Sequence, residues 1–253
     1  MAKKRRSFFD VYPEEYDILT NAKQREGYHR KEVRAIADEF EPKSVMDAGC
    51  ATGLTSRLFA ELGISTVGLD RAKPMLEIAR RNGSTNNKLL SYMYGTFEGL
   101  PKKLHGKFEL VVCLANAIAG VGTMKMLGQS LRNFRDVLSP GGTLLIQMLN
   151  YAALREGEIM PVRATENNGI VLERFSERRG KRLYLYVTRV DLKSDNPVVE
   201  VFRSEFDNFT PKEVENSLKK VGFTSIRRYN DLYLKKPFSK SSRDLVITAR
   251  RAD

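Results

Sequence analysis

The stretch Val45-Met46-Asp47-Ala48-Gly49-Cys50-Ala51-Thr52-Gly53 decides the fold of this chain. Its apolar beginning predicts a short strand over residues 44–47, and its glycines at 49 and 53 allow a tight turn into a helix over residues 52–62. The first amides of such a helix face the end of the strand and favour a ligand there. The turn is not specific by itself, because close helix packing also explains many glycine-rich turns.

Strand and helix patterns alternate on both sides of this turn. The expected strands cover residues 44–47, 66–69, 89–94, 108–113, 143–149, 225–232 and 244–249, and the expected helices cover residues 28–40, 52–62, 74–82, 125–138 and the stretch that begins at the capping box Thr210–Glu213. This alternation predicts a parallel sheet with helices on both faces. The unbroken apolar run over residues 110–114 is typical of a strand buried on both sides.

Residues 151–208 follow a different pattern. Strands expected at 170–175, 182–190 and 198–206, separated by short turns, predict an antiparallel meander. The sequence therefore predicts a single domain over residues 1–253. Within it, residues 1–40 form an N-terminal lid or helix, and residues 151–208 form an inserted antiparallel β cap.

A second expected strand ends at Asp70, about 20 residues after the glycine turn, where a carboxylate can accept hydrogen bonds from ribose hydroxyls. Together the two features predict an adenosine-containing ligand at the carboxyl edge of the sheet. A dinucleotide fold calls for Gly-x-Gly-x-x-Gly, which the turn does not provide. Asp47 would repel a pyrophosphate and could receive the ammonium of a methionine moiety. The alternative for both carboxylates is a helix cap or a solvated group.

Charge is the one unusual bulk property. The chain has 43 Lys and Arg against 31 Asp and Glu, a formal net charge of +12 and a pI of about 9.7. Such a balance favours anionic partners such as nucleic acid. The basic residues are spread along the chain, however, and only Lys3–Arg6 and Arg178–Arg182 form longer runs. We therefore favour a dispersed basic surface over a nucleic-acid site.

Cysteine and histidine are scarce. Cys50, Cys113, His29 and His105 are too few and too scattered for a disulfide framework or a zinc cluster. No apolar run approaches the roughly 20 residues that span a bilayer, and no apolar segment follows the basic N-terminus. These features predict a reduced, cytoplasmic protein without a metal site and without a membrane segment.

Several motifs together resemble the class I S-adenosylmethionine-dependent methyltransferases. The motifs are Asp47–Gly53, Asp70–Leu76, Tyr94–Pro101, Leu138–Gly142 and Val221–Phe223, and the resemblance covers residues 40–150 and 210–250. It implies an α/β fold with a seven-stranded, mostly parallel Rossmann-like methyltransferase sheet, helices on both faces, and S-adenosyl-L-methionine as cofactor. The stretches Cys113–Ala119 and Gln147–Tyr151 are similar to the glycine and sarcosine N-methyltransferase group.

The resemblance also implies roles for single residues. Cofactor contacts are expected at Asp47, Gly49, Cys50, Ala51, Gly53, Asp70, Arg71, Thr96, Phe97, Leu114 and Asn116. Thr96 and Phe97 would meet the adenine, the carbonyl of Leu114 would meet the methionine ammonium, and Asn116 would lie near the sulfonium. Asn116 and Tyr16 are the candidate catalytic residues, and Lys23 or Arg25 could pair with the cofactor carboxylate. Tyr12, Tyr16 and Tyr28 could close a lid or pack as ordinary aromatics.

The acceptor is left open at this point. The glycine enzymes carry an arginine where this chain has Leu149 and a histidine where it has Gly120, so glycine or sarcosine is disfavoured. A small-molecule acceptor methylated at N or O is preferred. An RNA methyltransferase is the alternative that the charge favours, but Leu114–Ala117 replaces the motif of base-amino methyltransferases. A non-catalytic cofactor-binding protein of the same fold is the third alternative. The sequence predicts no oligomeric state.

The expected cap strand over residues 182–190 has two unlike faces. Leu183 and Leu185 lie on one face, and Tyr184 and Tyr186 lie on the other. One hypothesis places the tyrosine face over the acceptor, where it would exclude water. The alternative is that the leucines pack on the core and the insertion serves stability or self-association.

Overall fold

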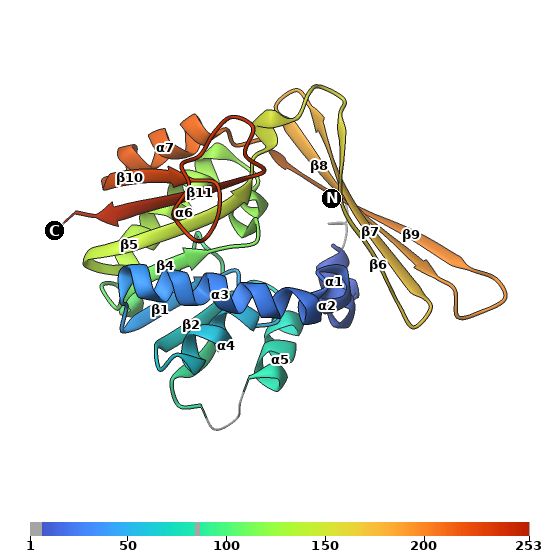
Figure 1. The fold of residues 1–253 in the computed structure, drawn as a ribbon, viewed down its shortest axis with the longest axis horizontal. Helices are drawn as coiled ribbons and strands as arrows, with labels where there is room; N and C mark the ends of the chain where they lie inside the picture. Colours follow the sequence, from blue (N-terminus) through green and yellow to red (C-terminus); the bar gives the residue numbers. More distant parts are fainter. Residues whose placement is uncertain (1–6, 84–86, 253) are drawn as a thin grey trace.

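The computed structural model describes residues 7–83 and 87–252, so the basic run Lys3–Arg6 lies outside the described residues. A seven-stranded sheet with the order β10-β11-β5-β4-β1-β2-β3 forms its centre (Figure 1). The strands are β1 Ser44–Ala48, β2 Ser65–Asp70, β3 Leu90–Tyr94, β4 Phe108–Cys113, β5 Leu138–Leu149, β10 Phe223–Tyr229 and β11 Asp244–Arg251. Neighbours from β5 to β3 are parallel, whereas β11 is antiparallel to both β5 and β10. The predicted mostly parallel, seven-stranded sheet is confirmed.

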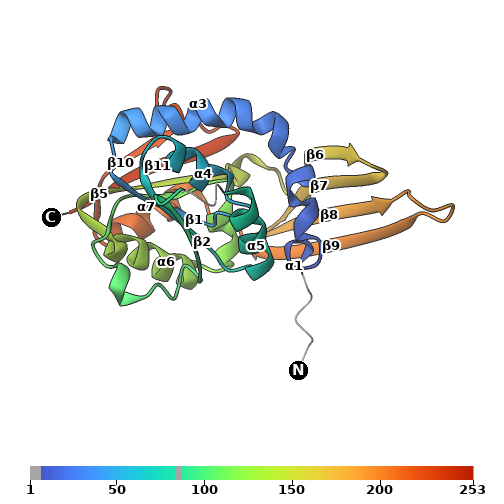
Figure 2. The same cartoon turned by 90° about the horizontal axis from the view of Figure 1, so that it is seen from below.

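Helices cover both faces of this sheet (Figure 2). The helices are α3 Ala22–Phe40, α4 Leu54–Glu61, α5 Lys73–Asn82, α6 Met124–Val137 and α7 Pro211–Lys220. Strand β4 shows why the run that begins at Leu110 is apolar. Leu110 and Val112 pack with α3 and α4, whereas Val111 and Cys113 pack with α6 and α7. Since helices cover both faces of the sheet here, the run has no solvent-exposed face, and polar residues do not alternate with apolar ones.

A second, four-stranded antiparallel sheet is inserted between β5 and α7. Its strands, in the order of the chain, are β6 Ile159–Asn167, β7 Ile170–Arg179, β8 Arg182–Asp191 and β9 Val198–Asp207. The sequence predicted the last three strands but missed β6. The reason is Pro161, which argues against a strand in the sequence but is accommodated because β6 is an edge strand with a register shift beside that proline.

The N-terminal segment, residues 8–19, lies between the inserted sheet and the carboxyl edge of the main sheet (Figures 1 and 2). It consists of three short pieces, α1 Phe8–Val11, η1 Pro13–Glu15 and α2 Tyr16–Leu19. Phe8 and Leu19 are buried against Leu172 and Val187 of the inserted sheet. The inserted sheet thus supplies the apolar surface that these short helices need.

The tyrosine face of β8 points away from this contact. Leu183 is buried against Tyr151 and Leu154, on the same side as Val187. On the opposite side, Tyr184 lies under two arginines, and Tyr186 stacks on Phe175 with 4.8 Å between ring centroids. The hypothesis that the tyrosines cover the acceptor is therefore wrong. The prediction that β8 has two unlike faces is confirmed, but its leucine face is the one that packs on the rest of the molecule.

Arg189 of β8 joins the inserted sheet to the N-terminal segment. Its guanidinium donates to both carboxylate oxygens of Glu15, with Nη2–Oε1 at 2.8 Å and Nε–Oε2 at 2.9 Å. It also lies 4.3 Å from the ring centroid of Tyr12, whose hydroxyl donates to Glu200. The side chain of Arg189 is only 9% exposed, so these contacts are shielded from solvent.

Replacing Arg189 with methionine should loosen the N-terminal segment. The change removes charged hydrogen bonds from a shielded carboxylate, at a cost of about 1.5–3 kcal/mol in the free energy of unfolding. Hydrogen exchange should then quicken at the amides of residues 8–19. Arg182→Met is the matched control, because Arg182 is half exposed in the same strand. Equal effects of the two variants would contradict a specific role for Arg189.

Candidate active site

The turn between β1 and α4 brings two loops into close contact. The amides of Gly49 and Cys50 both donate to the carbonyl of Leu69, at 2.8 and 3.0 Å. Gly49 has a φ of +85°, and a Cβ on it would lie 2.6 Å from the Cβ of Ala117 and 3.3 Å from the ring of Phe97. Only glycine fits where the turn meets the loop after β4.

Gly53 has a packing role that is visible in the structure. Its φ is +84°, and a Cβ there would lie 2.4 Å from the hydroxyl of Tyr92 and 3.0 Å from the Cβ of Ala79. The residue therefore allows the start of α4 to pack against β3 and α5. Close packing of the helix therefore accounts for glycine at this position, and the cofactor contact expected of Gly53 stays a prediction.

Asp70 ties the end of β2 to its two neighbouring turns. Its Oδ2 accepts from the amide of Ala51 at 2.9 Å, and its Oδ1 accepts from the amide of Ala72 at 2.8 Å. Burial raises the pKa of Asp70, and the two amide bonds oppose that rise. The carboxylate thus fixes the shape of the glycine turn and stays at the sheet edge, and its expected contact with a ribose stays a prediction.

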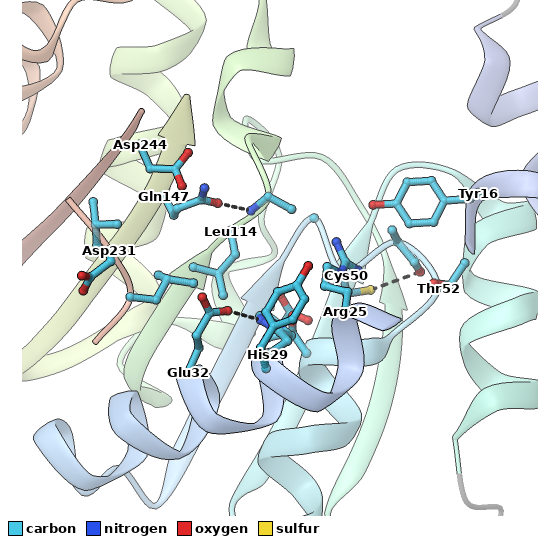
Figure 3. A pocket seen from close by; sticks show the side chains of 18 residues that line it. Tyr16, Arg25, His29, Glu32, Cys50, Thr52, Leu114, Gln147, Asp231 and Asp244 are labelled. Atoms are coloured by element: carbon cyan, nitrogen blue, oxygen red, sulfur yellow. Dashed lines mark hydrogen bonds and ion pairs between the residues drawn. The ribbon is translucent and has the colours of Figure 1, made fainter. Parts of the chain in front are cut away.

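A cavity of about 230 Å³ lies at the carboxyl ends of β1 and β4 (Figure 3). The predicted residues in its wall are Tyr16, Asp47, Gly49, Cys50, Ala51 and Leu114, together with Arg25 and Tyr28. The predicted residues outside its wall are Gly53, Asp70, Arg71, Thr96, Phe97 and Asn116. The cavity thus brings together the residues expected at the methionine carboxylate and ammonium. Asp70, Thr96 and Phe97, expected at the ribose and adenine, follow β2 and β3, whereas Asn116, expected near the sulfonium, follows β4.

Asp47 is a buried carboxyl group in this wall. It is 2% exposed, and its Oδ2 accepts from the hydroxyl of Ser56 at 2.6 Å. Burial raises the pKa of Asp47 to about 7, against the opposing effect of the Ser56 hydrogen bond. Near neutral pH the group is therefore close to half ionised. A cation bound beside it would favour the charged form.

Arg25 and Tyr16 form the end of the cavity near the N-terminal segment. Arg25 comes from α3, and its Nε is shielded from solvent without a hydrogen-bond partner among residues 7–83 and 87–252. Lys23, the other cation considered, is exposed and outside the wall. Burial raises the pKa of Tyr16, and the charges of Arg25 and Arg174 oppose it. Figure 3 shows the Tyr16 hydroxyl directed into the cavity.

Asn116 connects the ends of β4 and β5. Its Nδ2 donates to the hydroxyl of Tyr151 at 2.9 Å, and its Oδ1 accepts from the amide of Leu149 at 3.1 Å. Both ends of the amide are thus engaged in holding two other segments, and a direct catalytic role stays a prediction. The carbonyl of Leu114, expected to meet an ammonium, already accepts from the amide of Ala117 at 3.0 Å and retains one lone pair.

Thr96 and Phe97 follow β3 and lie at the far edge of the glycine turn. Thr96 is exposed, whereas Phe97 packs on Phe134 with 5.2 Å between ring centroids. The Phe97 carbonyl accepts from the side chain of Asn133 at 2.7 Å, which fixes this loop against α6. Their proposed contacts with an adenine stay a prediction.

Several wall residues were not found from the sequence. They are His29, Glu32, Gln147, Asp231 and Asp244. Arg174 of β7, whose charge acts on both Tyr16 and Tyr151, was missed as well. Gln147 begins the stretch Gln147–Tyr151 but was given no role there, and the other residues belong to no motif. All of them come from distant parts of the chain, so only the fold brings them together.

Over residues 7–83 and 87–252, no cluster of three or more His, Cys, Asp or Glu side chains is arranged to hold a metal ion. In the same part of the chain, no helix combines the length and apolarity needed to cross a bilayer.

Comparison with known proteins adds to this geometry. Residues 45–142 match the model of a methyltransferase domain. A glycine/sarcosine N-methyltransferase from Parasynechococcus marenigrum is 30% identical over 122 residues, which are 48% of this chain and 43% of that protein. The chain thus spans less than half of the length of this relative.

Two solved structures resemble the chain over most of its length. The CcbJ methyltransferase from Streptomyces caelestis has a TM-score of 0.75 at 22% identity, covering 88% of this chain and 89% of that one. An amino pentose methyltransferase from Micromonospora echinaspora, solved with S-adenosylmethionine bound, has a TM-score of 0.71 at 19% identity, covering 98% and 100%. The chain thus has the fold of these methyltransferases, and the domain match together with the glycine/sarcosine N-methyltransferase relative supports the class I S-adenosylmethionine-dependent methyltransferase superfamily.

Proposed function

We propose that this protein transfers the methyl group of S-adenosylmethionine to a small-molecule acceptor, at nitrogen or oxygen. The observation that carries this proposal is the cavity at the carboxyl ends of β1 and β4. It offers a glycine where a side chain would not fit, a shielded arginine Nε without a partner among the described residues, and a buried carboxyl group. This donor set suits a methionine moiety, which carries a carboxylate and an ammonium.

Three residues would each bind a different part of the cofactor. Arg25 would hold the cofactor carboxylate, Asp47 its ammonium, and Asp70 its ribose. When bound, S-adenosylmethionine supplies a methyl group that is already activated by its sulfonium. The protein therefore needs mainly to hold a neutral nucleophile close and aligned. The N-terminal segment and the inserted sheet, which contact each other above this edge, would act as lid and cap and exclude water.

The charge distribution supports a small acceptor over RNA. In the basic run Arg178–Arg182, the guanidinium of Arg178 donates to the carbonyl of Leu154 at 2.6 Å. Arg179 pairs with Glu177, and Arg182 pairs with Asp207. Two of the four cations of this run are thus paired with carboxylates. A cytoplasmic location, predicted from the sequence, stays a prediction.

Multiple-turnover methyl transfer tests the proposal. Labelled S-adenosylmethionine would be incubated with the full chain and a panel of small amines, alcohols, phenols and RNA. The proposal expects label on a small molecule, with several turnovers for each protein molecule. Label on RNA alone would favour the nucleic-acid alternative, and cofactor binding without any turnover would favour a non-catalytic protein.

Replacing Arg25 with methionine should weaken the binding of S-adenosylhomocysteine about 10- to 100-fold, the cost of losing hydrogen bonds to a charged group. Lys23→Met is the matched control, because Lys23 lies two residues away and is exposed. Calorimetric titration measures both. If the Lys23 variant loses as much affinity as the Arg25 variant, the cavity wall is not where the carboxylate binds.

A further inference from the structure

The cavity has two ends of different character (Figure 3). Near the glycine turn its wall carries Tyr16 and Arg25, whereas the far end carries Glu32, Asp231 and Asp244. In the proposed function, the methionine moiety occupies the first end. The far end is continuous with it and is open to a second ligand.

Only one of the three carboxylates at the far end has an unfilled, shielded oxygen. Glu32 lies 2.9 Å from the Nδ1 of His29, and the Oδ1 of Asp231 accepts from the amide of Tyr233 at 3.0 Å. The Oδ1 of Asp244 is shielded from solvent and has no hydrogen-bond partner in the described part of the chain. Asp244 thus interacts with the side chain of Gln147 but keeps one shielded carboxylate oxygen that has no hydrogen-bond partner among the described residues.

The surroundings of Asp244 are rigid. It is the first residue of β11, directly opposite Leu149 of β5. Beside it, the Oε1 of Gln147 accepts from the amide of Ala115 at 2.6 Å, at the end of β4. Burial raises the pKa of Asp244, and the neighbouring Arg243 and Gln147 oppose that rise. The pairing of β11 with β5 thus places Asp244 beside Gln147, whose side chain reaches the chain just after β4.

A shielded carboxylate oxygen without a partner is costly, and a ligand that donates a hydrogen bond and carries positive charge would remove that cost. An ammonium group supplies both. A hydroxyl group supplies only the hydrogen bond, and a carboxylate would be repelled by Glu32, Asp231 and Asp244 together.

We propose that Asp244 determines acceptor specificity, and that the acceptor is a small primary or secondary amine bound through its ammonium group at the far end of the cavity. This inference rests on the proposed function, because it assigns the other end to the cofactor. The Asp244 carboxylate is also placed to take a proton from the bound ammonium. When this proton moves to the carboxylate, the N–H bonding pair stays on the nitrogen as the lone pair that a methyl acceptor requires.

Ligand-observed NMR titration, which measures weak affinities, tests the inference. The probes are n-butylamine, 1-butanol and butanoate, each added to the full chain with and without saturating S-adenosylhomocysteine. We expect n-butylamine to bind at least tenfold more tightly than 1-butanol, and butanoate to bind least. Asp244→Asn should lower the amine affinity at least tenfold. Asp231→Asn, the matched control in the same wall, should change it less than threefold.

Three results would overturn the inference. The first is that the wild-type chain binds n-butylamine no more tightly than 1-butanol. This comparison does not depend on any variant. The second is an equal loss in the Asp231 and Asp244 variants, since a general negative field would then suffice. The third is a loss of S-adenosylhomocysteine affinity in Asp244→Asn that matches its amine loss, since the carboxylate would then serve the cofactor. Failure of S-adenosylhomocysteine to bind the wild type would count against the proposed function, while the titrations without it still test Asp244.

Discussion

Replacing Asp47 with asparagine should stabilise the fold most at alkaline pH. The folded-state pKa of about 7 lies above that of an unfolded aspartate, so between about pH 4 and pH 7 the folded chain holds a proton that the unfolded chain has lost. The free energy of unfolding therefore falls as the pH rises through this window. Asparagine removes the titration, and its stabilising effect should be about 2.5 kcal/mol larger at pH 8 than at pH 5.

Denaturant unfolding of both proteins at the two pH values measures this difference. Ser56→Ala is the companion variant, because it removes the hydrogen bond that favours the charged carboxylate. It should cost more stability at pH 8 than at pH 5, the opposite trend to Asp47→Asn. The asparagine variant should also bind S-adenosylhomocysteine about tenfold or more weakly, since the ammonium loses its charged partner. A difference in stability that does not change with pH would show that Asp47 does not titrate in this window.

Replacing Gly49 with alanine should both destabilise the fold and abolish cofactor binding. A φ of +85° costs an alanine about 1–2 kcal/mol. The new Cβ would also lie 2.6 Å from that of Ala117, and relieving such crowding costs about 1–3 kcal/mol more. Because the turn and the loop after β4 must separate, affinity for S-adenosylhomocysteine should fall at least 100-fold.

Gly63→Ala separates strain from crowding. Gly63 has nearly the same φ, +82°, but a Cβ there meets nothing within 4 Å. This control should therefore lose only the conformational term and keep its cofactor affinity. Equal losses of stability in the two variants, measured by denaturant unfolding, would mean that the contact with Ala117 is not tight.

The sequence predicted the elements whose patterns are local. The apolar run of β4 is readable because helices cover both faces of that strand, and the glycine turn is readable because its positive φ angles require glycine. Gly53 shows what a local sequence pattern does not reveal. It satisfies the motif, but its contact is Tyr92 of β3, which only the fold reveals.

The rest of the site depends on contacts between distant segments. Asp244 reaches the cavity because β11 is inserted antiparallel beside β5, about 100 residues away in the chain. Arg174 and Arg189 reach the N-terminal segment because the inserted sheet turns its leucine face inward. Alternation along β8 predicted two faces, but it carries no information on which face meets the core.

Calorimetric titration of the full chain with S-adenosylhomocysteine, followed by titration with NAD, tests the central claim most directly. We expect saturable binding of S-adenosylhomocysteine at one site for each chain, weakened in Arg25→Met, and no binding of NAD. Binding of NAD at the same site, or S-adenosylhomocysteine affinity that is unchanged in Arg25→Met and Gly49→Ala, would contradict it.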